Sequence, residues 1–138
     1  MLVTNMPFKG VELMTSHRIL QLNAVSTAAC ALAVLAARSS LYALFGLADP
    51  TLLDVVAIAS LAYAGALALA ARRQPVTREA LMAFSVVDGL WVAASVVVLL
   101  AFWSQLAPIA RLLIIVVGLV VEIFATLQFR AARSPQVA

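Results

Sequence analysis

The chain has 138 residues, of which 65% are hydrophobic and 11% charged, and its mean hydropathy is +1.11. This composition excludes an ordinary water-soluble domain, because too few polar side chains remain to cover the surface of a globule. In lipid, the outward faces of helices need no polar cover. Cys30 is the single cysteine, which excludes an internal disulfide framework and a cysteine zinc cluster.

Four apolar stretches separated by short polar breaks fill most of the chain. They cover residues 19–37, 52–71, 80–103 and 109–129. Each is close to the ~20 residues that a helix needs to cross the hydrocarbon core of a bilayer. The sequence therefore predicts an all-α fold, namely one transmembrane domain over residues 1–138 that forms an integral membrane antiparallel four-helix bundle.

The breaks contain residues that begin and end helices. Asp49 precedes Pro50 as a capping acid, and Asp54 is expected to serve the free amides of the same first turn. Thr77 is the expected cap of the third long helix. The connection at residues 104–108 is too short for anything but a tight return, so the third and fourth helices are expected to be antiparallel neighbours.

Small side chains recur along the second apolar stretch and predict close helix packing. One row repeats every four residues and a second row is less regular; they consist of Ala62, Ala66 and Ala70, and of Ala57, Ala64 and Ala68.

The basic residues gather at the ends of the apolar stretches rather than in a patch for nucleic acid. Seven of the nine fall on one side of the predicted membrane. Cytoplasmic segments carry an excess of Lys and Arg, so both termini and the second connection are expected in the cytoplasm. The seven are Lys9, Arg18, Arg72, Arg73, Arg78, Arg130 and Arg133, and the other two are Arg38 and Arg111.

Two acids lie deep inside apolar sequence, where capping does not explain them. Asp88 follows Arg78 by ten residues, and Glu122 precedes Arg130 by eight. At 1.5 Å per residue, both lie roughly 12 to 15 Å from the cytoplasmic edge, on neighbouring helices. An ionised carboxylate at that depth costs at least ~2 to 3 kcal/mol, so such groups usually face the bundle interior with a partner. The sequence therefore predicts an intramembrane carboxylate pair.

Further polar residues at a similar depth extend this pair into a predicted polar layer. They are Asn23, Ser60, Tyr63 and Thr126. Two interpretations remain open. In the first, the layer binds and releases a proton or a small cation; in the second, it is a neutral hydrogen-bonded clamp that fixes the helix register.

Other chemistries find little support in the sequence. His17 is the only histidine, and no serine–histidine pair, glycine-rich phosphate loop or metal-spaced cluster is present. We therefore expect no catalytic residues, no metal, no cofactor and no nucleic-acid partner, and we do not expect an enzyme.

The chain resembles small, uncharacterised four-span proteins of the bacterial inner membrane. The resemblance is carried by Asn23, Tyr63, the run 88–91 and the stretch 122–128, and it covers all four predicted helices. It implies a location in the bacterial inner (plasma) membrane and implies no activity. Small multidrug exporters have a similar length, but they carry their essential acid in the first helix, and here that helix has none.

The sequence thus favours a small accessory or structural membrane component without catalytic activity. Its expected partners are the lipid bilayer and a larger membrane protein or further copies of itself. The alternative is a proton- or cation-linked transporter of small solutes that uses the pair Asp88 and Glu122.

Overall fold

The structure is a computed structural model that describes residues 15–134, and over this range it contains helices and no strands. The elements are α1 (Ser16–Ala36), α2 (Arg38–Leu44), α3 (Thr51–Arg72), α4 (Arg78–Phe102) and α5 (Pro108–Arg133). Four of them have 21 to 26 residues and are apolar enough to span a membrane. The all-α class and the four long apolar helices are therefore confirmed. Lys9, counted above with the cytoplasmic basic residues, lies outside the described residues.

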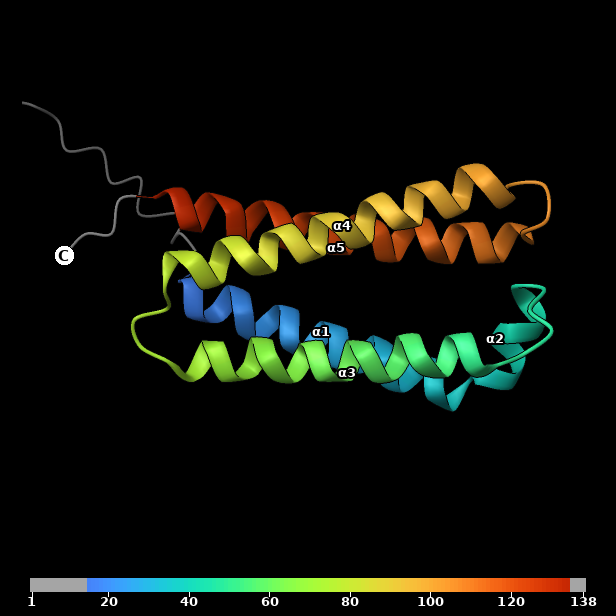
Figure 1. The fold of residues 1–138 in the computed structure, drawn as a ribbon, viewed down its shortest axis with the longest axis horizontal. Coiled ribbons are helices and arrows are strands. Elements are labelled where there is room, and N and C mark those ends of the chain that lie inside the picture. The colour runs from blue at the N-terminus through green and yellow to red at the C-terminus, as the bar shows by residue number, and fades with distance from the viewer. Residues whose placement is uncertain (1–14, 135–138) are drawn as a thin grey trace, which may run out of the picture.

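The long helices pack as two pairs, α1 with α3 and α4 with α5, and α1 also touches α5. The chain reverses direction from each long helix to the next (Figure 1). The pairs come together at the end where α3 leads into α4, and they diverge toward the end that carries α2 (Figure 1).

The apolar core lies at the end where the two pairs meet. Its largest members, Leu20, Leu67 and Leu81, are at most 1% exposed and come from α1, α3 and α4. Ala132 adds α5 to the same cluster. The cluster therefore joins the two helix pairs, and truncating one of its leucines to alanine is expected to cost about 2 to 5 kcal/mol.

The face that α3 buries differs from the predicted one. Ala62 and Ala66 of the regular four-residue row are exposed. The buried residues instead belong in part to the second row and are Ala57, Ala64, Leu67 and Ala71. Their spacings of seven, three and four correspond to two turns, one turn and one turn, so the buried positions recur every 3.5 residues per turn. This repeat keeps one helix facing a neighbour along its length, here α1. A perfect four-residue row drifts around the helix and leaves that interface.

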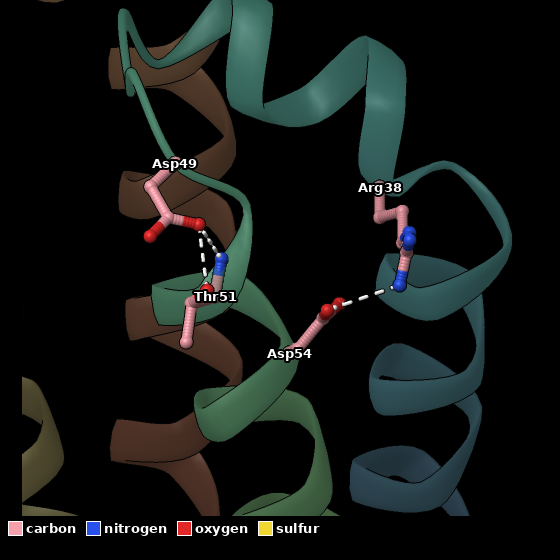
Figure 2. A network of polar contacts seen from close by, with 4 residues as sticks. All are labelled: Arg38, Asp49, Thr51 and Asp54. Atoms are coloured by element: carbon pink, nitrogen blue, oxygen red, sulfur yellow. Dashed lines mark hydrogen bonds and ion pairs between the residues drawn. The ribbon is translucent and has the colours of Figure 1, made fainter.

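The predicted cap of α4 is confirmed, whereas α3 begins at Thr51 with Pro50, not Asp49, as its N-cap residue. The Thr77 hydroxyl accepts a hydrogen bond from the Ala80 amide at 3.2 Å. At the start of α3, Asp49 Oδ1 accepts from the Thr51 amide at 2.9 Å and from the Thr51 hydroxyl at 2.6 Å (Figure 2). These two bonds lower the pKa of the Asp49 carboxyl, the hydroxyl contributing more than the amide.

The predicted capping role of Asp54 is wrong. The Asp54 amide already bonds the Pro50 carbonyl, and the carboxylate forms an ion pair with Arg38 at 3.0 Å (Figure 2). Arg38 is within reach because it begins α2, a short helix that the sequence pattern does not predict. The pair joins the α1–α2 corner to the first turn of α3.

Candidate functional site

Asp88 occupies the inward face of α4. Leu81, Ser85 and Asp88 are the buried residues of this helix, and their spacings of four and three place them on one face. The carboxylic side chain is 4% exposed although it lies among apolar neighbours in the sequence. The expected polar layer therefore has a buried carboxyl group near the joint of the two helix pairs.

Side chains from the first helix pair donate to both oxygens of this carboxyl group. Asn23 Nδ2 of α1 donates to Asp88 Oδ2 at 2.8 Å. The Tyr63 hydroxyl of α3 lies 2.8 Å from Asp88 Oδ1 and 3.2 Å from the Phe84 carbonyl oxygen. We call Asn23, Tyr63 and Asp88 the Asp88 cluster. Its hydrogen bonds connect α1 and α3 to α4.

Two further contacts orient the donors of the Asp88 cluster. The Thr27 hydroxyl donates to Asn23 Oδ1 at 3.1 Å. Because the amide oxygen is thereby occupied, the amide nitrogen is directed at Asp88. The Tyr63 ring meets the Phe84 ring edge-on, with centroids 5.7 Å apart, a favourable arrangement for two aromatic rings.

Gln128 of α5 is a buried polar neighbour that the sequence reasoning did not single out. It is 0% exposed and lies beside the Asp88 carboxyl. Neither of its amide atoms completes a hydrogen bond within the described residues. Ser85, by contrast, donates to the Ala125 carbonyl at 2.8 Å and ties α4 to α5. The signal in the sequence was a polar amide side chain at the end of the apolar stretch 109–129.

The predicted carboxylate pair does not form. Glu122 and Thr126 are exposed on the outside of α5, and the Thr126 hydroxyl lies 3.4 Å from Glu122 Oε1. The inward face of α5 repeats every seven residues through Gly118, Ala125 and Ala132 and through Gln128. One inward position of this repeat lies seven residues before Gln128, and Glu122 is the next residue along the chain. A step of one residue rotates the side chain by about 100° around the helix axis. Equal depth therefore does not bring the two acids together.

Ser60 and His17 also lie apart from the Asp88 cluster. Ser60 donates to the Val56 carbonyl of its own helix at 2.7 Å. His17 bonds the Ala71 carbonyl oxygen and links the start of α1 to the end of α3. Of the predicted layer, the structure therefore joins Asn23, Tyr63 and Asp88.

Within residues 15–134, no basic side chain forms an ion pair with Asp88. The ion pair of this part of the chain joins Arg38 and Asp54. The described part of the chain also contains no group of three His, Cys, Asp or Glu side chains that could hold a metal ion. A carboxyl group with two donors and no counter-charge can hold helices together or exchange a proton. The chain matches no family model, no curated protein and no solved structure, so these residues are the basis for assigning a function.

Proposed function

We propose that this chain is an integral membrane protein whose two helix pairs form one antiparallel four-helix bundle in the bilayer. Large apolar side chains cover the outside of the helices; Leu90 is 65% exposed and Leu100 77% exposed. Such an outer surface is unfavourable in water and matches hydrocarbon. Resistance of the membrane-bound chain to alkaline extraction tests this proposal.

The proposed topology has both termini in the cytoplasm of a bacterial cell, with the bundle in the inner membrane. It is supported by the gathering of Arg72, Arg78 and Arg130 at the end where the helix pairs meet, following the excess of basic residues in cytoplasmic segments. The bacterial location follows from the resemblance described above. A reporter active only outside the cytoplasm, fused after Arg133, is expected to stay inactive.

The role that the geometry supports best is that of a non-catalytic accessory or structural membrane component. The observation that carries it is the use of both Asp88 oxygens as acceptors for donors on two other helices. The buried polar groups are thereby engaged in helix-to-helix contacts, and they fix how one helix pair meets the other. Such a component acts by assembling with another membrane protein or with further copies of itself.

Neutral substitution at Asp88 tests the structural role. Asp88→Asn keeps the size of the side chain and one oxygen acceptor, so the variant is expected to fold and to retain its partners. Asp88→Leu removes both acceptors and leaves the buried Asn23 amide without its partner, so it is expected to weaken the bundle. Affinity purification of the full-length chain in mild detergent, with identification of co-purified membrane proteins, compares the two variants. Loss of assembly in Asp88→Asn would contradict a purely structural role.

A second candidate is proton- or cation-linked transport through Asp88, favoured by one specific observation. Gln128 lies beside the carboxyl group with its amide unpaired, so the site has polar capacity that the described residues do not use. Since Glu122 lies outside the bundle, this function would depend on Asp88 alone. A pH-dependent flux in proteoliposomes that Asp88→Asn abolishes, while the fold stays intact, would favour transport over the accessory role.

A further inference from the structure

The outside of α5 carries a regular row of exposed residues that the rest of residues 15–134 leaves uncovered. Their spacing alternates between three and four, and we call them the outer seam: Leu112, Ile115, Leu119, Glu122, Thr126 and Phe129. This alternation is the repeat by which one helix packs against another along its length with a left-handed crossing.

α5 already uses a repeat of this kind on its inner side. Gly118, Ala125 and Ala132 are buried at intervals of seven, and α4 packs along α5. The outer seam has the same period and lies one residue further around the helix, a rotation of about 100°. It therefore presents a second face of the same geometry next to the α4 interface, with room for a further helix.

Lipid chains cannot form hydrogen bonds with the polar groups at the centre of the outer seam. Glu122 and Thr126 are polar and exposed, near the middle of a helix of 26 residues. Their mutual contact of 3.4 Å is longer than a good hydrogen bond between oxygens. A carboxyl group at this depth is costly without a protein partner. The seam is thus apolar toward both ends, and the polar groups of Glu122 and Thr126 at its centre lack good hydrogen-bond partners.

We propose that the outer seam pairs with the outer seam of a second copy of this chain. The inference rests on the membrane insertion proposed above. Two copies inserted in the same orientation are related by an axis along the membrane normal, so their α5 helices run parallel and each residue meets its equivalent at the same depth. Glu122 and Thr126 then face Glu122 of the partner subunit and Thr126 of the partner subunit, and apolar residues face apolar residues.

The self-complementary pattern identifies the occupant of the seam. A partner shifted by one turn would bring the Glu122 carboxyl of one copy against Thr126 and that of the other against Leu119, so one of the two would stay unpaired. A polar layer within an otherwise apolar seam fixes register and orientation in this way. Each Thr126 hydroxyl can donate to a Glu122 carboxyl oxygen of the other copy, and it also supplies an acceptor.

Cysteine cross-linking in native membranes tests the pairing. In the full-length chain with Cys30→Ala, single Leu119→Cys and Ile115→Cys variants are oxidised and compared with Val120→Cys. Val120 is the matched control, because it is 38% exposed, close to the 39% of Ile115, and lies about 100° around the helix axis from Leu119. We expect several-fold more disulfide-linked dimer at the two seam positions. Equal cross-linking at Val120, the absence of dimer at all three positions, or capture of a different protein would overturn the proposal.

Substitution of Glu122 tests the polar layer separately. Glu122→Gln keeps hydrogen-bonding atoms, whereas Glu122→Leu removes them. Energy transfer between labelled copies in vesicles is expected to show association weakened roughly threefold to twentyfold by the leucine, the range of one hydrogen bond in a membrane. Glutamine should preserve most of the association. Unchanged association of Glu122→Leu would contradict the role given to the carboxyl group.

Membrane fractionation of the same samples separates the two proposals. A chain that alkali extracts from the membrane would refute the proposed membrane function and this inference with it. A chain retained in the membrane as a monomer would refute this inference alone.

Discussion

Removal of the Tyr63 hydroxyl is the smallest change that isolates one bond of the Asp88 cluster. Tyr63→Phe keeps the ring and its edge-on contact with Phe84. It deletes the donor that lies 2.8 Å from Asp88 Oδ1. The variant therefore leaves one oxygen of a carboxyl group that is 4% exposed without its donor, while Asn23 still serves the other oxygen.

The size of the effect follows from the burial of the acceptor and from its being a carboxyl group. Hydrogen bonds to charged groups contribute about 1.5 to 3 kcal/mol in soluble proteins, whereas side-chain bonds between membrane helices average about 0.6 and reach about 1.7 kcal/mol. Asp88 is 4% exposed and has no ion pair among the described residues. We therefore expect Tyr63→Phe to lower the free energy of unfolding by about 1 to 2 kcal/mol.

The assay is reversible unfolding of the purified chain in mixed micelles, followed by helix content. Tyr42→Phe is the matched control, because Tyr42 is the other tyrosine and lies in α2, outside the Asp88 cluster. A double-mutant cycle with Asp88→Asn isolates the coupling of the hydroxyl to the carboxyl group. Additive effects in the cycle, or equal stability of the two Phe variants, would refute the hydrogen bond as a joint between α3 and α4.

Three further changes probe other bonds of the structure. Thr77→Ala removes the cap of α4 and is expected to lower the free energy of unfolding in micelles by about 1 kcal/mol; no change would show that the cap contributes nothing. Thr51→Val removes the hydroxyl donor of Asp49, so an NMR titration should show the Asp49 pKa rising toward its ordinary value. Because the folded-state pKa of Asp49 is lowered, its stabilising contribution is present at neutral pH and is lost as the pH falls through that pKa. An unchanged titration would contradict the bond. Gln128→Met replaces an unpaired buried amide with an apolar chain of similar length and should stabilise the protein by about 1 kcal/mol in the same unfolding assay, whereas a loss of stability would reveal a partner such as a buried water.

Sequence pattern was sufficient for the four long helices and, to within a few residues, for their ends, although it missed the short helix α2. The predicted stretches 52–71 and 109–129 became Thr51–Arg72 and Pro108–Arg133, because apolar length and capping residues act locally along the chain. Asp88, Asn23 and Tyr63 could be nominated for a similar reason. A polar side chain inside an apolar helix is rare enough to indicate a contact, and its depth follows from the rise per residue.

Helix rotation is what the sequence left undetermined. Depth placed Asp88 and Glu122 at one level, but only the choice of packed face decides whether a side chain points inward. On α3 the structure buries Ala64 and exposes Ala62, although the two residues are equally small. In a membrane protein the hydrophobic contrast that marks the inner face of a soluble helix is weak, since lipid and core are both apolar. Rotation therefore depends on packing between helices that are distant in sequence.

The two deep acids of this chain therefore have different expected roles, Asp88 in the fold of one copy and Glu122 in contact with another chain. Hydrogen bonds from Asn23 and Tyr63 satisfy Asp88 within one copy, so that group constrains how the helix pairs join. Within residues 15–134, Glu122 is contacted by the Thr126 hydroxyl at 3.4 Å, so its carboxyl group still requires a hydrogen-bond partner on the outside of the bundle. If polar groups in hydrocarbon require protein partners, an acid that one copy cannot satisfy specifies contact with another chain at that depth. Substitution of Asp88 should then destabilise the fold of the single copy, whereas substitution of Glu122 should weaken association and leave the fold intact.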